Sequence, residues 1–312
     1  MSLSFSALLS ALPGCVAQGV IWGIMALGLY ITFRLLEFSD LTVDGSFATG
    51  GAVTVMLVLQ GCPTFWAVMA AVAVGILTGL VTGALHTRLG IAPILSGILT
   101  QIALYSVNLH ILGNKANQAV SVNKYHLLLS LRDTGSAIVV SLLFAAVLVA
   151  LYYWFFGTEL GSAIRATGSN PGMSTAQGID IRKMKVLGLG LANGIVALSG
   201  GLMAQYQGFA DVQMGRGAIV IGLAAIIIGE VLHSALAKNN QNFAVRLLFV
   251  ILGGIVYYLV MGIALWLRLP TNDLKLFTAI IVAVFLAIPQ LRHKGYRSTK
   301  KANAREEASV HG

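Results

Sequence analysis

The apolar stretch SAIVVSLLFAAVLVALYYWFF (136–156) is followed by the polar segment GTELGSAIRATGSNPGMSTAQGIDIRKMK (157–185) and then by VLGLGLANGIVALSGGLMAQYQGF (186–209). Each apolar run has the roughly 20 residues that one helical crossing of a bilayer requires. The polar segment carries four basic and two acidic residues, so it must lie in water at one membrane surface. This alternation predicts a helical membrane protein with a substantial loop on one face.

The composition of the whole chain supports the same fold class. Hydrophobic residues make up 57% of the chain and charged residues only 10%, whereas soluble domains carry about 25% charged residues. The apolar segments are too long for the roughly 10-residue alternation of an outer-membrane strand. The formal charge of +9 indicates membrane orientation rather than a nucleic-acid partner. We therefore expect an all-α integral membrane bundle that binds no nucleic acid.

Apolar length and polar breaks divide residues 1–290 into about nine spans, followed by a basic tail at 291–312 that we expect to be disordered in the cytoplasm. The expected spans are 13–33, 41–60, 64–87, 91–112, 136–156, 186–209, 217–236, 244–267 and 274–290. Asp40 and Asp44 flank the start of the second span, which predicts a broken or re-entrant segment there. No internal sequence repeat is convincing at this stage.

The basic residues predict the orientation of these spans. If the loop 157–185 is cytoplasmic, fourteen Lys and Arg residues lie inside and six lie outside. Because cytoplasmic segments carry the excess of Lys and Arg, this distribution favours an N-terminus outside and a C-terminus inside. We expect the bacterial inner membrane to hold the protein in this orientation.

The polar loop itself contains the signals of a short helix. Asn170 is a good N-cap, Pro171 suits the first helical position, and Gly178 is a natural stop. A helix of two turns is marginal in water unless another protein holds it. An ordinary amphipathic surface loop is the alternative interpretation.

The loop also resembles a known motif. Its sequence is similar to the form G-x-A-I/L-R-A-x-G-x-N-P-x-A-A-x-x-x-G-I of ABC-importer permeases of the branched-chain amino acid and ribose type. The matching residues are Gly161, Ala163, Ile164, Arg165, Ala166, Gly168, Asn170, Pro171, Ala176, Gly178, Ile179 and Lys185. The opening segment from Gly19 to Val53 also resembles the first helices of such permeases.

This resemblance implies a type II importer fold in which a dimer of permease subunits, in this case most simply two identical copies, surrounds a central path. Two cytoplasmic ABC ATPases would bind ATP and Mg, so the chain itself would need no cofactor and would not be an enzyme. A periplasmic or lipid-anchored binding protein would deliver a small solute. The ATPase-coupling residues would be Arg165, Asn170, Pro171, Met173, Ala176, Gly178 and Lys183.

One departure bears on the solute. Branched-chain members usually have an N-F-A-H-G-like turn after the first helix, whereas this chain has FSDLTVDGSF at 38–47. That form is more similar to a less characterised branch, some of whose members are linked to tryptophan or tyrosine uptake. The resemblance therefore favours an amino acid, and an aromatic one before a branched one.

The chain lacks a G-x-x-x-x-G-K-[ST] phosphate loop, so we expect ATP hydrolysis in a separate polypeptide. Polar residues at membrane depth are costly and usually face a path or a bundle interior. The candidates for the translocation path are Asp44, Ser46, Gln101, Asn108, Asn193 and Gln205. Hydrogen bonding between helices is the competing role for these side chains.

A second functional class stays open at this stage. In an ion-gradient-driven secondary transporter, Asp44 or Glu230 would be the coupling carboxylate. For Glu230 we also expect an ion pair, with His233 or Arg246 as its partner. A secondary transporter would explain the bundle, but it would leave the helical loop unexplained.

Overall fold

The computed structural model describes residues 5–267 apart from 123 and 238–241, together with 276, 279, 280, 283 and 284. The tail 291–312 lies outside these residues, as does most of the expected span 274–290. Within the described part, every long element is a helix.

The first described element is α1 (Phe5–Tyr30), which continues into the π-helical turn η1 (Ile31–Leu35). The elements that follow η1 are α2 (Val43–Leu59), α3 (Thr64–Leu89), α4 (Pro93–Ile111), β1 (Asn117–Ala119), α5 (Thr134–Gly157), α6 (Glu159–Ser169), α7 (Pro171–Ala176), α8 (Ile181–Gln207), β2 (Phe209–Asp211), α9 (Ala218–Leu236) and α10 (Phe243–Trp266). β1 and β2 form a small antiparallel ribbon in which Gln118 pairs with Ala210.

The predicted spans agree with these helices. Seven of the described helices are long and apolar enough to cross a membrane, and α2 is a shorter apolar helix. The expected break before the second span is also present, because the chain leaves η1 at Leu35 and only re-enters an α-helix at Val43. The chain is therefore an all-α polytopic membrane protein.

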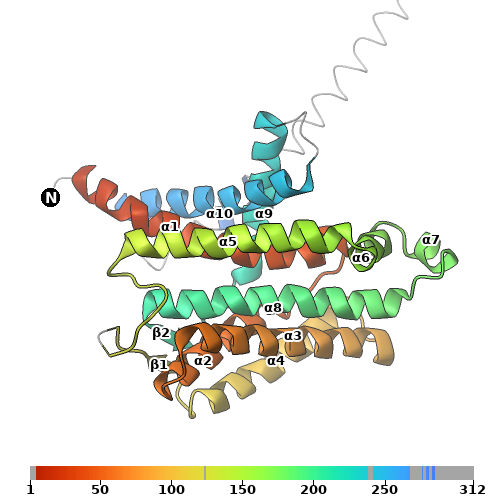
Figure 1. Ribbon diagram of the computed structural model, residues 1–312, viewed down its shortest axis with the longest axis horizontal. Helices are drawn as coiled ribbons and strands as arrows, with labels where there is room; N and C mark the ends of the chain where they lie inside the picture. Colours follow the sequence, from red (N-terminus) through yellow and green to blue (C-terminus); the bar gives the residue numbers. More distant parts are fainter. Residues whose placement is uncertain are drawn as a thin grey trace, which may run out of the picture.

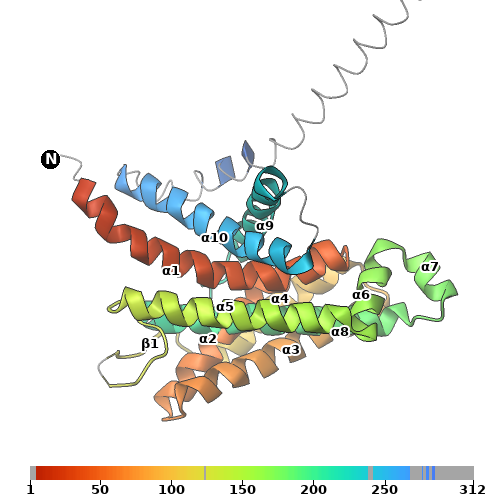
Figure 2. The same cartoon turned by 45° about the horizontal axis from the view of Figure 1, so that its top comes forward.

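Two helices, α1 and α8, form the centre of the bundle (Figure 1). In the most apolar window of each, 78% of residues are buried, against 28% in α4 and in α5. α8 packs on α3, α2 and α1, while α1 also packs on α10, α5 and α9. The ribbon lies at one end of the long axis and α7 projects from the other, as both Figure 1 and Figure 2 show. We call these the ribbon end and the α7 end.

The closest packing in the bundle joins α3 to α8. Gly75, Gly79 and Gly83 recur at four-residue spacing along α3, and a Cβ atom at Gly79 would overlap the backbone oxygen of Leu189. Small residues allow helices to approach backbone to backbone in a membrane, where interhelical contact replaces the hydrophobic effect. This glycine row therefore allows the close packing of α3 on α8.

The fold contains an internal repeat that the sequence alone did not make apparent. GIMAL (23–27) in α1 matches GIVAL (194–198) in α8, and FSDL (38–41) matches FADV (209–212). Both matches have the same offset, because 194 minus 23 and 209 minus 38 both equal 171. Since α1 runs towards the α7 end and α8 runs away from it, the two units have inverted topology.

The two aspartates of the repeat make the same local bond. The backbone N–H of Thr42 donates to Asp40 at 2.9 Å, and that of Gln213 donates to Asp211 at 2.7 Å. Each aspartate thus closes a turn that leads the chain back into the bundle, before α2 in one unit and before α9 in the other. The inverted repeat therefore comprises helix, break and re-entrant helix.

Candidate functional site: a membrane cavity and a surface helix pair

The first turn of α2 lies at the middle of the bundle rather than at a membrane surface. The Ser46 hydroxyl is 2.7 Å from Thr78 Oγ1, midway along α3, and donates at 2.7 Å to Oδ1 of Asn193, midway along α8. Both α3 and α8 are long enough to span the hydrocarbon layer. α2 therefore begins inside the membrane.

The start of α9 lies at the same depth because Asp44 binds it. The Asp44 carboxylate accepts from the backbone N–H groups of Gly217 at 3.0 Å and Ile219 at 3.1 Å. These are amides that a helix start leaves without an intrahelical partner. One side chain in the first turn of α2 thus caps α9, and the two discontinuous helices meet N-terminus to N-terminus.

A cavity of about 490 Å³ opens beside this junction. Its volume is within the range of about 300–1,000 Å³ that is typical of small-molecule sites. It is lined by Asp44, Gly45, Gln101, Ile102, Tyr105, Ser106, Asn108, Val212, Gln213 and Arg216. The lining therefore comes from the start of α2, from α4 and from the segment that follows β2.

Asn108 differs from the rest of this lining in being buried without a hydrogen-bond partner among the described residues. Its side chain is only 1% exposed, and neither amide atom has a hydrogen-bond partner among the described residues. An unpaired buried polar group costs about 1–3 kcal/mol. Such a group calls for a polar partner, which a molecule in the cavity can supply.

Behind the cavity lies a fully buried polar network around Asp40. The Asp40 carboxylate has no exposed surface and accepts from Nδ2 of Asn193 at 2.7 Å as well as from Thr42. Thr42 is in turn 2.7 Å from Thr82, whose hydroxyl donates to Thr100 at 2.9 Å. The network thus ties α2, α3, α4 and α8 together at the level where α2 begins.

The six polar residues expected along the path therefore fall into separate places. Asp44, Gln101 and Asn108 line one cavity. Ser46 and Asn193 belong to the buried network and have no exposed surface. Gln205 lies elsewhere, where its Oε1 accepts from the backbone N–H of Leu128. For these last three, hydrogen bonding between segments describes the observed contacts.

At the α7 end, the polar loop forms two helices instead of the single one expected. α6 buries Gly161, Ile164 and Gly168 on one face, while Arg165 on the other face is exposed. A Cβ atom at Gly168 would overlap the backbone oxygen of Leu35 in η1. The backbone of α6 therefore rests directly on the turn that ends α1.

The short helix that the sequence predicted is α7, and its ends are as expected. Asn170 Oδ1 accepts from the backbone N–H of Met173 at 2.9 Å, and Pro171 occupies the first turn. Gly178 follows in the left-handed region with φ of 81°, and the N–H of Ile179 returns to the Ser174 oxygen. Met173 is 62% exposed, and Ala176 is exposed beside it. The helix thus presents an apolar tip to solvent.

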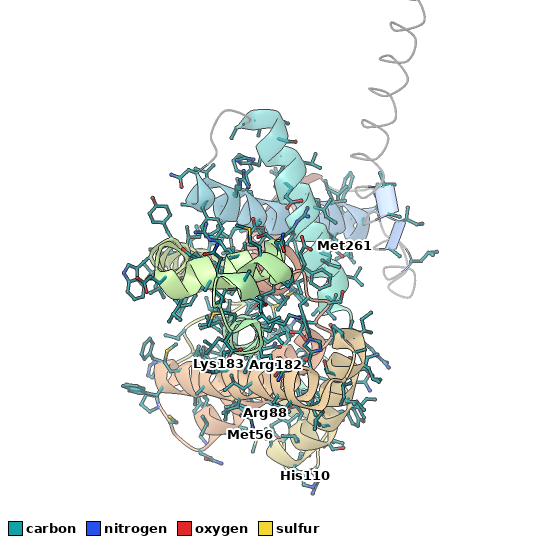
Figure 3. All side chains as sticks on the ribbon, turned by 90° about the vertical axis from the view of Figure 1, so that its right-hand side faces the viewer. Met56, Arg88, His110, Arg182, Lys183 and Met261 are labelled. Atoms are coloured by element: carbon teal, nitrogen blue, oxygen red, sulfur yellow. The ribbon has the colours of Figure 1, made fainter. Side chains whose placement is uncertain are left out.

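Basic residues surround this tip at the α7 end. Figure 3 looks onto this end, with Arg88 from the end of α3 and Arg182 and Lys183 from the start of α8. Lys183 forms an exposed ion pair with Asp180 at 3.3 Å, and Arg165 contacts Ser162 at 3.5 Å. The surface is therefore polar and mostly basic around an apolar point.

Asp180 also caps α8 by accepting from the backbone N–H groups of Arg182 and Lys183. The amide of Lys183 is the largest cause of a pKa for Asp180 below its ordinary value of 3.8. The cap therefore contributes fully above pH 3.8 and is lost as the pH falls through the lower native pKa.

An ion pair links η1 to α9 at the same end. Arg34 pairs with Glu230, whereas we expected His233 or Arg246 as the partner of this carboxylate. Arg34 reaches this carboxylate because the broken end of α1 brings residue 34 next to α9. His233 and Arg246 line a cavity of about 210 Å³ around Glu230.

A family comparison matches this arrangement. Residues 12–294 match the family model described as the permease component of a branched-chain amino acid transport system. The chain belongs to this permease family. It is the permease component of an amino acid transport system and a multi-pass membrane protein.

The permease also resembles individual proteins. It is 38% identical over 297 residues, 95% of this chain and 96% of the relative, to the tyrosine transport system permease protein of Clostridioides difficile. It is 32% identical to an uncharacterised Rickettsia prowazekii protein, over 86% of this chain and 94% of the relative. A probable branched-chain amino acid transport permease protein, LivH of Methanocaldococcus jannaschii, is 25% identical over 62% of this chain and 65% of the relative. No solved structure matches the permease.

Two features were not predicted from the sequence: two of the residues that line the cavity, and the helix α6. Arg216 and Gln213 reach the cavity only because β2 folds back, and nothing in their local sequence announces a site. α6 carried a weak signal, since its buried residues Gly161, Ile164 and Gly168 have the spacing of one helix face. The helix was not predicted because the glycines on this face lower its helix propensity.

Proposed function

We propose that the permease is the membrane-spanning subunit of an ATP-driven importer, and that tyrosine or another aromatic amino acid is its solute. The relative from Clostridioides difficile, named for tyrosine, supports this solute because it aligns along nearly the whole permease. The departure at 38–47 from the usual branched-chain turn agrees with it. Tyrosine is therefore the first solute to test.

The α6–α7 pair is the proposed coupling element, and it is the observation that carries this function. A capped helix of six residues is marginal on its own, and its exposed Met places an apolar side chain in water. Such a flexible side chain is suited to fill an apolar groove on a partner. In this role Met173 and Ala176 enter the groove of an ABC ATPase, while Arg165 and Lys183 attract its surface. Asn170, Pro171 and Gly178 hold the helix in shape, and the ATPase binds the ATP and Mg.

The contact between α6 and η1 supplies a route for the movement. α6 rests on the backbone of Leu35, and the chain runs from there through Asp40 to Asp44 at the cavity. A displacement of α6 would therefore act on the start of α2 without passing through long flexible side chains. The close approach at Gly168 makes this contact stiff.

The cavity is the proposed part of the translocation path, with Asp44, Gln101 and Asn108 in its wall. α4 supplies much of that wall and leaves several large apolar side chains exposed, among them Ile94, Leu95 and Leu99. A second copy of the permease packed along this helix would enclose the path between two subunits. We propose a homodimer because a second copy would close this open wall, whereas the exposed apolar side chains of α4 alone would equally suit contact with lipid.

The distribution of basic residues supports one orientation in the membrane. We place the α7 end in the cytoplasm of a bacterium and the ribbon end outside the inner membrane, which puts the N-terminus outside and the C-terminus inside. A periplasmic or lipid-anchored binding protein then meets the ribbon end. Residues 1–290 form the transmembrane domain, with 157–185 as its coupling loop and 291–312 as a cytoplasmic tail.

The test replaces the apolar tip. Met173→Asp together with Ala176→Asp places two charges in the ATPase groove, so co-purification of the ATPase and ATP-driven uptake of L-tyrosine should both fall at least tenfold, since burying an unpaired charge is costly. Ala116→Asp, an exposed alanine at the ribbon end, is the matched control for ATPase co-purification. Intact co-purification and uptake in the double variant would refute the coupling role.

The same preparation separates this function from an ion-gradient-driven transporter. Asp44 already accepts two backbone N–H bonds and caps α9, which supports a structural and binding role rather than ion coupling. Uptake should therefore survive collapse of the proton gradient and stop when ATP is depleted. The opposite pattern would favour the secondary transporter.

A further inference from the structure

We propose that the cavity at the α2–α9 junction binds the zwitterionic backbone of an α-amino acid, with Asp44 facing the ammonium group and Arg216 the carboxylate. The proposal deepens the proposed function and rests on it, because it names the chemistry by which the path recognises its solute. Three observations support it: the opposite charges of Asp44 and Arg216 in one cavity wall, the position of the α2–α9 junction inside the membrane, and the buried, unpaired amide of Asn108.

Asp44 is held where an ammonium group can reach it. Each of its two carboxylate oxygens accepts one backbone N–H from α9, and each keeps a further lone pair. Because it caps α9 and stands in the first turn of α2, its carboxylate is fixed by two helix N-termini. The side chain is thus a rigid acceptor in the cavity wall.

Arg216 supplies the opposite charge from the same wall. Its exposed guanidinium has five N–H donors, and its hydrogen bond to Gln213 Oε1 at 3.3 Å uses one of them. No direct ion pair joins it to Asp44 among the described residues, although both side chains line the same cavity. The wall of one cavity therefore carries two opposite charges that form no ion pair with each other in the described structure.

Asn108 is the independent observation that points to a ligand. Its amide is buried in the wall of the same cavity, with neither the oxygen nor the nitrogen paired in the described structure. A solute that carries both donors and acceptors would satisfy both atoms. An ammonium and a carboxylate on one carbon provide this combination.

The remaining lining suits the rest of an amino acid. Tyr105 and Ile102 on α4 are exposed into the region of the cavity, and they offer aromatic and aliphatic contact to a side chain. A ligand with one charge would leave either Asp44 or Arg216 without its counter-charge. The site therefore discriminates against amines and acids that share the same ring.

The test compares three ligands on the purified full-length permease in lipid nanodiscs. L-tyrosine carries both charges, tyramine lacks the carboxylate, and 3-(4-hydroxyphenyl)propanoate lacks the amine. L-tyrosine should bind at least tenfold more tightly than either analogue, because each analogue loses one charge-assisted contact. L-tryptophan and L-leucine are tested in parallel to cover a solute with another side chain.

Two charge-removing variants assign the roles. Arg216→Gln should abolish the preference for L-tyrosine over tyramine and keep the preference over the propanoate. Asp44→Asn should abolish the preference for L-tyrosine over the propanoate and keep the preference over tyramine. Arg216 is exposed, so its variant keeps the test valid even if Asp44→Asn fails to fold. Lys115→Gln, an exposed residue at the ribbon end outside the lining, is the control that should change neither preference.

Two results would overturn the proposal. One is equal weakening of all three ligands in Arg216→Gln, which would indicate a structural role. The other is absence of binding by all three amino acids in a permease whose reconstituted complex imports them. These binding contrasts are measured without the ATPase, so they are independent of the proposed function, which fails if the complete complex shows no ATP-driven uptake.

Discussion

The two units of the inverted repeat start alike and end differently. In both, an aspartate closes the same turn before a re-entrant helix. Asp40 is fully buried among α2, α3 and α8, whereas Asp211 is half-buried on the ribbon. The same motif therefore has two environments in the permease. In the first unit it is buried in the bundle, next to the contact with α6. In the second unit it lies beside the cavity and remains partly accessible to water.

The largest difference between the two units is expected in the free energy of unfolding that is lost when each aspartate is replaced. Asp40→Ala leaves the amide of Thr42 and one amide proton of Asn193 unpaired in a buried site, so the free energy of unfolding should fall by about 3 kcal/mol. Asp211→Ala should cost under about 1 kcal/mol because water can replace the lost bond. Chemical unfolding in detergent micelles measures both, and equal losses would contradict the contrast.

A smaller difference is expected between two glycines at the junction. A Cβ at Gly215 would overlap the backbone oxygen of Asp44, whereas the shortest contact of a Cβ at Gly45 would be 2.9 Å, to the movable Cδ1 of Leu104. Gly215→Ala should therefore lower the free energy of unfolding by about 2 kcal/mol, and Gly45→Ala by under about 1 kcal/mol. The ligand affinity of the cavity should fall with Gly215→Ala. If Gly45→Ala were the more damaging change, the described junction would be wrong.

The smallest effect is expected where the first unit meets α9 through charge. Arg34 and Glu230 are 51% and 37% exposed, so solvent screens their ion pair. A double-mutant cycle with Arg34→Gln and Glu230→Gln should give a coupling energy under about 1 kcal/mol, and less at high salt. Glu159→Gln on α6 is the control. A coupling energy above about 2 kcal/mol would contradict this expectation, because the ion pair would then be a major contributor to the stability of the first unit.

Much of the fold follows from the sequence because bilayer thickness sets helix length. The expected span 64–87 corresponds to Thr64–Leu89, and the expected break before residue 43 is present because Asp40 cannot continue an apolar helix. The short helix α7 was likewise predictable from Asn170 and Pro171, since capping is a local property. The coupling role of that helix remains a prediction.

The repeat and the cavity were not accessible in the same way. Two short matches separated by ten residues mean little until the fold shows that both flank a re-entrant helix. Asp44 and Asn108 were candidates because polar groups are costly in lipid, but Arg216 joins them only through the tertiary path of the segment after β2. Long-range proximity of this kind has no local sequence signal.

The contact between α6 and η1 is where movement of the surface helices would reach the cavity, so it is the contact to perturb. We compare Gly168→Ala, whose Cβ would overlap the Leu35 backbone, with Gly172→Ala on α7, whose Cβ would meet its nearest atom, Asn170 Oδ1, at 3.6 Å. The readout is L-tyrosine imported per ATP hydrolysed in proteoliposomes that hold the permease, its ATPase and its binding protein. We expect Gly168→Ala to retain the ATPase and its hydrolysis but to lose at least tenfold in uptake per ATP, while Gly172→Ala matches the wild type. An unchanged ratio in Gly168→Ala would contradict it.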